Sequence, residues 1–326
     1  MSLVRIGVIG CADIARRSVV PAILNLKDQY ALSGIASRTK EKAEEFASLF
    51  DIVPYTGYES LLNKDEIDAV YIPLPNSMHA KWIEEALAKD IHVLVEKSLA
   101  CSFEEVKHLN ELASSRRLVL LENFQFRFHE QLAVINNMVN EGKIGEIRCL
   151  KSSFGFPPFP DIDNIRYKKE LGGGALLDAG VYPIKIAQIF LGQNVEVSAA
   201  NIWFDSKKNI DIWGGAYLKQ KDGPMFAEVA FGFDNFYQCN LELWGSEGKI
   251  YTNRIFTAKP DFSPEIIFES SNGKNIINVE PCNHFEKMLL HLYNLINAKE
   301  GLASEYVQNI NQSRLICEAM SIACKR

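Results

Sequence analysis

The first third of the chain alternates short apolar runs with amphipathic stretches. Apolar runs lie at Leu3 to Ile9, Ala31 to Ala36, Ala69 to Ile72, His92 to Val95 and Leu118 to Leu121; helix-like stretches lie at Lys40 to Leu49, Ser77 to Ala88 and Phe103 to Ser114. Short continuous apolar runs favour buried strands, whereas apolar positions at helical spacing favour helices. This alternation predicts parallel strands joined by right-handed crossovers.

The pattern changes near residue 122. The apolar runs that follow are mostly consecutive and turn-linked: Ile147 to Phe154, Val195 to Phe204, Gly214 to Leu218, Phe226 to Phe231, Tyr237 to Leu243 and Lys249 to Thr252. They predict a largely antiparallel sheet, with helices near Phe285 to Ala298 and Ser304 to Ala323. The 326 residues are too many for one ordinary core. We therefore expect an α/β chain with a doubly wound parallel domain of Rossmann type at 1–121 and an α+β domain with an open sheet at 122–326.

The first apolar run ends in a series of small residues, Gly7, Gly10, Ala12 and Ala15. This resembles a dinucleotide-binding fingerprint with alanine at its second and third glycine positions, which still leaves room for a pyrophosphate at a helix N-terminus. An ordinary buried strand that enters a turn is the alternative. The cofactor contacts expected in this turn are Gly10, Cys11, Ala12, Asp13 and Ile14.

Ser37 and Arg38 follow the second apolar run, where an NAD-binding chain normally places a carboxylate for the ribose 2′-hydroxyl. A hydroxyl and a guanidinium instead suit a 2′-phosphate. Lys40 and Lys42 add positive charge, although the neighbouring glutamates also fit a solvated mixed-charge helix. The pattern favours NADP and leaves NAD open.

Further polar pairs follow later runs. Pro75 and Asn76 come after the run at Ala69, and Glu96 and Lys97 after the run at His92. Because ligands of parallel sheets bind at the carboxyl ends of the strands, these pairs are expected near a cofactor.

A second cluster lies in the segment Gly172 to Pro183. Asp178 and Tyr182 stand four positions apart, so a helix that opens after the glycines places both on one face. The glycines permit close approach of another molecule to the backbone. A tyrosine beside a carboxylate suits proton transfer to a bound ligand.

Together these segments give the chain a family resemblance over nearly its whole length. The matching motifs are Gly7 to Ala15, Ser37-Arg38, Val70 to His79, Val95 to Lys97, Glu122 to His129 and Gly172 to Pro183. They resemble the glucose-fructose oxidoreductase, inositol dehydrogenase and rhizopine-catabolism (Gfo/Idh/MocA) family. Tyr182, where many members have histidine, is similar to the branch of dihydrodiol dehydrogenases, xylose dehydrogenases and sugar-nucleotide 3-ketoreductases.

The resemblance implies that Lys97 contacts both the nicotinamide ribose and the substrate. It also implies that Asn76 reaches the cofactor, although Pro-Asn is common in turns. Glu96 is expected at the nicotinamide ribose or in the turn itself, and His79 as a further cofactor neighbour or a packing residue. Ser98 replaces the family's usual proline, which makes a cis bond there doubtful, since a non-prolyl cis peptide costs about 2.5 to 4 kcal/mol. The sequence leaves the isomer of this peptide open.

These residues predict a hydride-transfer enzyme. In a reduction, Tyr182 gives a proton to the carbonyl oxygen, Lys97 stabilises the developing negative charge, and Asp178 orients Lys97 or a substrate hydroxyl. Arg127 is a candidate substrate contact, as is His129, with a domain-bridging ion pair as the alternative. Arg166 and Tyr167 are candidate substrate contacts in a loop, where mobile surface residues are the alternative.

Charge and composition exclude other classes. A net charge of −6, from 35 basic and 41 acidic residues, argues against a nucleic-acid surface. No long apolar run or signal segment is evident, so no membrane is expected. Seven scattered cysteines suggest a reduced, cytoplasmic protein, and no metal-ligand spacing occurs.

The sequence thus predicts an NADP-dependent oxidoreductase for a sugar, a sugar nucleotide or a cyclic polyol. Two alternatives stay open: an NAD-dependent dehydrogenase of a diol or pentose, and a non-catalytic NADP-sensing regulator of the same fold. The open sheet needs its second face covered, so we expect a homodimer or homotetramer.

Overall fold

The computed structural model describes residues 2–63 and 66–325, which divide into two compact units. The first unit comprises residues 1–123 and 285–310, and the second comprises 124–284 and 311–326. The predicted domains, 1–121 and 122–326, place their boundary within two residues of this division. The observed first unit differs from the predicted one because it also includes residues 285–310, whose side chains pack there.

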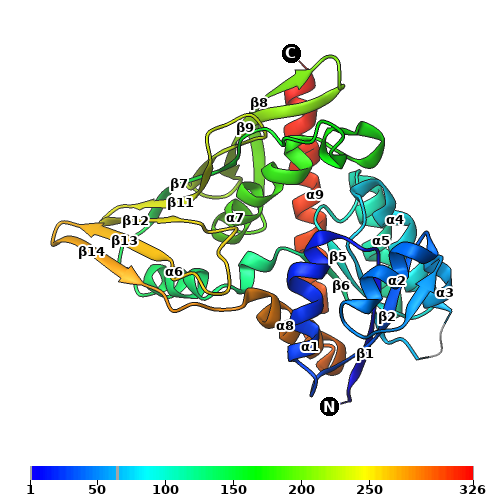
Figure 1. The fold of residues 1–326 in the computed structure, drawn as a ribbon. Helices are drawn as coiled ribbons and strands as arrows, with labels where there is room; N and C mark the ends of the chain where they lie inside the picture. The colour runs from blue at the N-terminus through cyan, green and yellow to red at the C-terminus, as the bar shows by residue number, and fades with distance from the viewer. Residues whose placement is uncertain (1, 64–65, 326) are drawn as a thin grey trace. The chain divides into compact units, whose positions relative to one another are not determined.

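The first unit contains a six-stranded, wholly parallel sheet in the order β3-β2-β1-β4-β5-β6 (Figure 1). Its strands are β1 (Val4–Ile9), β2 (Tyr30–Ser37), β3 (Pro54–Thr56), β4 (Ala69–Ile72), β5 (His92–Glu96) and β6 (Leu120–Asn123). Its helices are η1 (Ala15–Val19), α1 (Val20–Asn25), α2 (Lys40–Ser48), α3 (Tyr58–Leu62), α4 (Asn76–Ala88), α5 (Phe103–Arg116), nearly all of α8 (His284–Ala298) and the first part of α9 (Leu302–Cys324). The predicted doubly wound parallel sheet is confirmed.

Polar contacts attach the C-terminal helices to this sheet. The Tyr30 hydroxyl donates to the carbonyl of Leu289 in α8 at 2.6 Å. In α9, the Asn309 amide donates to the carbonyl of Leu120 and to the side chain of Asn110, both at 3.0 Å. Buried polar groups cost free energy unless they are paired, so these bonds favour the return of the chain to the first unit.

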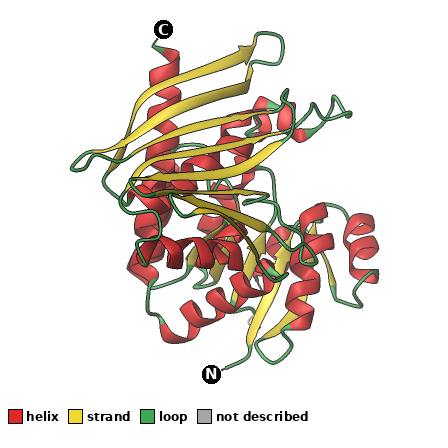
Figure 2. Ribbon diagram, turned by 90° about the vertical axis from the view of Figure 1, so that its left-hand side faces the viewer, coloured by secondary structure: helices red, strands yellow, loops and turns green. Residues whose placement is uncertain are grey.

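The second unit contains an eight-stranded sheet in the order β14-β13-β12-β11-β7-β10-β9-β8 (Figure 2). Its strands are β7 (Ile147–Gly155), β8 (Val195–Asp205), β9 (Ile210–Gln220), β10 (Phe226–Gly232), β11 (Gln238–Gly245), β12 (Gly248–Asn253), β13 (Glu265–Ser270) and β14 (Gly273–Asn278). Among the strands that the structure describes in this sheet, only β7 and β10 pair in parallel, so the predicted largely antiparallel sheet is confirmed.

Helical elements of the second unit lie between these strands and before them. They are η2 (Gln125–Phe128), α6 (Glu130–Asn140), η3 (Ile165–Tyr167), η4 (Lys169–Leu171), η5 (Leu176–Gly180) and α7 (Val181–Leu191). Helix α7 packs against β7, β9 and β10, and nine of its eleven residues are buried. A helix that is apolar on all sides belongs in a core.

The helical stretch Lys169–Leu191 is long and apolar enough to cross a membrane by length and composition alone. However, 78% of its apolar window is buried. Its composition therefore matches its place as the core helix of the second unit.

Candidate active site

In the first unit, Gly10 directly follows β1 in a conformation that favours glycine, with φ at +114°. A Cβ atom there would approach Leu74 Cδ2 to 2.7 Å, and the Gly10 amide donates to the Ala36 carbonyl at 2.9 Å. The turn is therefore as tight as a dinucleotide fingerprint requires. Ala12 and Ile14 lie in the predicted turn and precede η1.

The side chains of this turn are already engaged within the first unit. Asp13 pairs with Arg16 at 2.6 Å and with Arg17 at 2.5 Å, and the Arg16 hydrogen bond lowers its pKa. The Cys11 thiol lies 3.4 Å from the Lys42 carbonyl, and partial burial raises its pKa, which disfavours the reactive thiolate. The backbone of this turn, more than its side chains, therefore offers groups to a ligand.

Ser37 and Arg38 lie at the carboxyl end of β2, as predicted. Ser37 is buried, while Arg38 is exposed. The positive charge of Arg38 acts to lower the pKa of the nearby Tyr58 hydroxyl. Burial nevertheless dominates and raises the pKa of Tyr58. The two positions at this strand end thus hold a hydroxyl and a guanidinium, and neither holds an acidic side chain.

His79 is fully buried in α4, where its ring joins two backbone segments. Nδ1 lies 2.7 Å from the Ser98 carbonyl oxygen, and Nε2 lies 2.7 Å from the Leu74 carbonyl oxygen. These two acceptors favour a proton on each nitrogen, but burial outweighs them and lowers the pKa of His79 to about 4. The arrangement favours the packing role of His79 over cofactor binding, because both ring nitrogens are engaged.

The peptide between Lys97 and Ser98 is cis, the isomer that the serine made doubtful. The residues beside it have strong partners: the Ser98 carbonyl bonds to His79, and the Leu99 amide donates to Glu122 at 2.8 Å. These buried contacts, made by residues distant in sequence, were not visible in the local pattern.

Glu96 precedes this peptide and accepts hydrogen bonds from two further side chains. The Tyr71 hydroxyl donates to Glu96 Oε1 at 2.5 Å, and the Asn123 amide donates to the same oxygen at 2.7 Å. Burial raises the pKa of Glu96, and these hydrogen bonds oppose the rise. The carboxyl ends of β4, β5 and β6 thus meet at Glu96, directly beside Lys97. Asn76 and Pro75 lie at the start of α4, after β4.

In the second unit, the triple-glycine segment is held too closely for side chains. A Cβ atom on Gly173 would lie 2.5 Å from the Arg166 carbonyl oxygen, and the Gly174 amide donates to that same oxygen at 3.0 Å. Gly174 itself has φ at +122°. The glycines therefore serve the packing of their own loop, a role that the sequence did not suggest.

Asp178 and Tyr182 lie in one helical segment, as predicted, although its first turn is a π turn rather than an α turn. A π turn is wider than an α turn, so the two side chains remain on adjoining sides. Asp178 accepts a hydrogen bond from Arg166 Nε at 2.8 Å, which forms a partly buried ion pair. The Arg166 guanidinium also lies 4.9 Å from the Phe159 ring centre.

Tyr182 is 7% exposed and lies among phenylalanine rings of the second unit. Its ring centre lies 5.1 to 6.0 Å from those of Phe124, Phe126, Phe154 and Phe256. Such rings fix the orientation of the phenol through edge contacts. This aromatic cage was not recognised in the sequence, because its four phenylalanines come from three separate segments.

The remaining candidates have structural partners in the second unit. Arg127 lies 5.2 Å from the ring centre of Phe128, and the Tyr167 hydroxyl accepts a bond from the Phe159 amide at 3.0 Å. His129 is buried and packs edge-on against His284 at 5.5 Å, where burial lowers the pKa of His284 to about 3. Tyr167 and His129 thus both take part in the packing of this unit.

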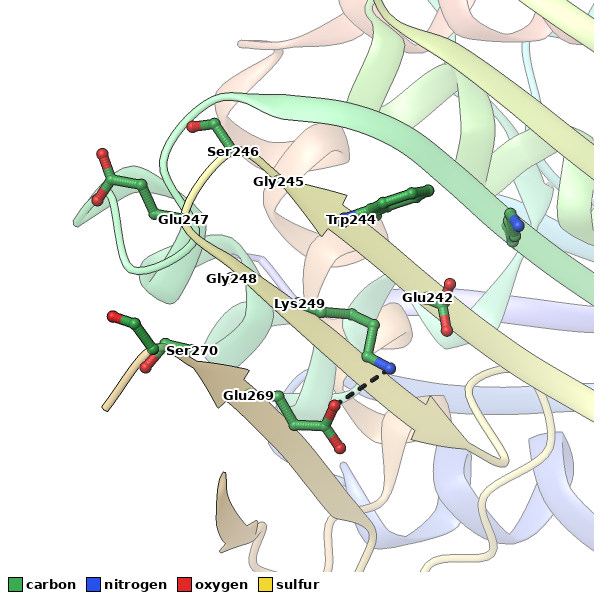
Figure 3. Close-up of a pocket in the computed structure, with 11 residues that line it drawn as sticks. Glu242, Trp244, Gly245, Ser246, Glu247, Gly248, Lys249, Glu269 and Ser270 are labelled. Carbon is green, nitrogen blue, oxygen red and sulfur yellow. Dashed lines mark ion pairs between the residues drawn. The ribbon is translucent and has the colours of Figure 1, made fainter. Parts of the chain in front are cut away.

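A separate hollow of about 520 Å³ lies at the turn between β11 and β12 (Figure 3). It is lined by polar side chains, including Lys249 and Glu269, whose charged groups pair at 3.2 Å. None of its lining residues is a predicted site residue. Among the described residues, no group of three or more His, Cys, Asp or Glu side chains is arranged to hold a metal ion.

The tight turn at Gly10, the parallel sheet and the polar strand ends define a nucleotide-binding domain of an oxidoreductase. Residues 4–124 match the oxidoreductase family with an NAD-binding Rossmann fold, and residues 133–251 match the GFO/IDH/MocA C-terminal domain. The chain belongs to the Gfo/Idh/MocA oxidoreductase family, which confirms the resemblance seen in its motifs.

Similar proteins come from several sources. The chain is 42% identical to a dTDP-3,4-didehydro-2,6-dideoxy-alpha-D-glucose 3-reductase of Saccharopolyspora spinosa, over 97% of this chain and 94% of that protein. It is 29% identical to a D-xylose 1-dehydrogenase (NADP(+)) of Haloferax volcanii, over 86% and 85%. The crystal structure of a 3-ketoreductase from Actinomadura kijaniata in complex with NADP and TDP-benzene has a TM-score of 0.93, at 35% identity over 98% of both chains.

Proposed function

We propose that the protein is an NADP-dependent ketoreductase that reduces a carbonyl carbon of a sugar nucleotide, with a thymidine diphosphate keto sugar as the substrate class. The observation that carries this proposal is likeness to 3-ketoreductases across both units, at 42% identity over 97% of the chain. A domain match alone would leave the substrate open, because one fold serves many reactions.

The first unit fits a dinucleotide. Its glycine turn allows close approach of a pyrophosphate, and Ser37 with Arg38 suits a 2′-phosphate better than a free 2′-hydroxyl. We therefore assign NADP as the cofactor. Its nicotinamide supplies the hydride when bound. Gly10, Ala12, Ile14, Asn76, Glu96 and Lys97 remain our candidate contacts, and Cys11 and Asp13 contribute through their backbone.

The catalytic groups act on the carbonyl oxygen. Tyr182, oriented by its aromatic cage, donates a proton to this oxygen, while the Lys97 ammonium stabilises the charge that develops there. Asp178 fixes Arg166 through their 2.8 Å pair. We assign Arg166 and Arg127 to the substrate, since a guanidinium suits the diphosphate of a sugar nucleotide.

Turnover tests this assignment directly. The purified protein should consume NADPH when it is given a dTDP-linked 3-keto sugar, and the product should carry a hydroxyl at the former carbonyl carbon. D-Xylose with NADP is the control, because the Haloferax relative is a xylose dehydrogenase. Tight NADPH binding without turnover of any carbonyl sugar would instead support the sensing regulator.

We also propose that the protein forms a homodimer or homotetramer through the open face of its large sheet. Exposed aromatic side chains occur along neighbouring strands β8 and β9: Trp203 and Trp213 stack at 6.2 Å, and Tyr217 follows on β9. Apolar surface of this kind favours contact with a second copy. Light scattering should show an oligomer that Trp213→Asp weakens. Phe236→Asp, in the loop between β10 and β11, is the control, and a monomeric wild type would refute the proposal.

We further propose that the protein is cytoplasmic. The seven cysteines are free thiols, as is usual in a reducing compartment. Fractionation of the native host, with antibody detection, checks this location.

A further inference from the structure

Asp211 lies near the start of β9, but its side chain serves the helical segment that carries Asp178 and Tyr182. The residue is 4% exposed. Its Oδ2 accepts a short hydrogen bond from the Leu176 amide, and the Ala175 amide also donates to the carboxylate. The first N–H groups of a helix have no partner within the helix. Asp211 therefore caps this helical segment from a distant strand.

Gly174 shows how closely the cap is fitted. A Cβ atom at this position would collide with Asp211 Oδ1. The Gly174 carbonyl in turn accepts a hydrogen bond from the Asp178 amide at 3.2 Å. The carboxylate thus sets the position of Gly174, and Gly174 sets the position of the turn in which Asp178 begins.

The buried position of the Asp211 carboxylate costs solvation free energy. Burial raises the pKa of Asp211 to about 6, and the groups that favour its charge are backbone amides, those of Leu176, Ala175 and Asp211 itself. An apolar residue of similar size would avoid this cost but would leave the helix amides without an acceptor. Such an arrangement is typical of a group that serves geometry at a functional site.

We propose that Asp211 is a positioning residue of the reaction: by capping the helical segment behind Gly174, it holds Asp178 and Tyr182 in the geometry that proton transfer needs. This inference rests on the proposed function, because it takes Tyr182 as the proton donor. Asp211 itself touches neither the substrate nor the cofactor in this role. A displacement of about 1 Å at a reacting group can cost on the order of 10²-fold in rate.

Two substitutions remove the cap to different degrees. Asp211→Asn keeps one acceptor oxygen and should lower kcat by roughly 10-fold, whereas Asp211→Leu keeps none and should lower it by roughly 10²-fold. The Kd for NADPH should stay within about twofold, because its candidate contacts lie in the first unit and are not changed. A merely structural residue would instead lower the yield of folded protein, while the folded fraction kept its kcat.

Asp205 offers a matched control. Its exposed carboxylate also accepts two backbone hydrogen bonds, from the amides of Lys207 at 2.7 Å and Lys208 at 3.1 Å. It is the last residue of β8, and both of these bonds lie within the turn that follows the strand. Asp205→Asn should leave kcat unchanged.

Amide hydrogen exchange provides a second measurement that needs no turnover. Exchange at Ala175 and Leu176 should be slow in the wild type and faster in Asp211→Asn. Faster exchange with an unchanged kcat would overturn the positioning role, and unchanged exchange would overturn the cap itself. If the wild type reduces no carbonyl sugar, the proposed function fails and the positioning role fails with it, while the exchange data still decide whether the cap exists. Should Asp211→Leu not fold, Asp211→Asn decides the matter alone.

Discussion

The two units hold their candidate chemical groups by different means. In the first, Gly10, Arg38 and Lys97 follow the carboxyl ends of parallel strands, so the topology of the sheet itself gathers them. In the second, Asp178 and Tyr182 lie on a buried helical segment whose position depends on side chains from other strands and loops.

This difference predicts where substitutions will act. Changes at strand ends of the first unit, apart from the catalytic Lys97, should alter cofactor affinity and leave the scaffold intact. Changes around the helical segment of the second unit should alter turnover, because the segment is held by a few specific side-chain contacts. The predictions below test this division, from the largest expected effect to the smallest.

The largest effect is expected for Tyr182→Phe. The substitution keeps the ring and its contacts with Phe124 and Phe154 but removes the transferable proton. Turnover should fall by roughly 10² to 10⁴-fold, as expected for loss of a general acid or base, while NADPH affinity remains. Steady-state kinetics and fluorescence titration with NADPH measure the two quantities.

Lys97→Met should reduce turnover by a similar factor, and the double variant should be little worse than either single one if the two residues act as a unit. An unchanged kcat in Tyr182→Phe would remove the tyrosine as proton donor. Lys97, or a water molecule held by Asp178, would then be the remaining source of the proton.

The sequence predicted the first unit in more detail than the second for a physical reason. Parallel strands buried on both faces have continuous apolar runs, so β1, β2, β4, β5 and β6 were located from pattern alone. The short edge strand β3, exposed in part, gave no such signal. In the second unit, β13 and β14 were missed because their residues are largely intermediate or exposed, without a clear buried face.

The same reasoning applies to the candidate site. Gly10, Arg38 and Asp178 were found because turn geometry and helical spacing are local properties of a sequence. Asp211 was missed, as were the partners of the Lys97-Ser98 peptide, because each depends on a residue many positions away. His79 showed the same limit, since its two carbonyl partners belong to segments that only the fold brings together.

An intermediate effect is expected for Arg38→Ala. Its guanidinium is exposed at the end of β2, where charge-assisted hydrogen bonds to a 2′-phosphate contribute about 1.5 to 3 kcal/mol. The variant should lose most of its preference for NADPH over NADH and bind NADH as the wild type does. Titration calorimetry with both cofactors measures this preference. Equal affinity for NADPH and NADH in the wild type would contradict the NADP assignment.

The smallest effect concerns acid stability, where the buried His284 provides a test within the second unit. Its pKa is about 3 in the fold but 6.5 in the unfolded chain, so between these values only the unfolded chain binds the proton. The stability it contributes is therefore complete above pH 6.5 and is lost as pH falls towards 3. Acidification from pH 7 to pH 5 should cost about 2 kcal/mol through this residue. The effect of Asp211 on stability has the opposite sign in this pH range, because burial raises its pKa.

The difference between the wild type and His284→Gln isolates the histidine, because Asp211 is present in both. Urea unfolding at the two pH values should show a smaller acid loss in the variant by this amount, and equal losses would mean that His284 already carries a proton in the folded protein.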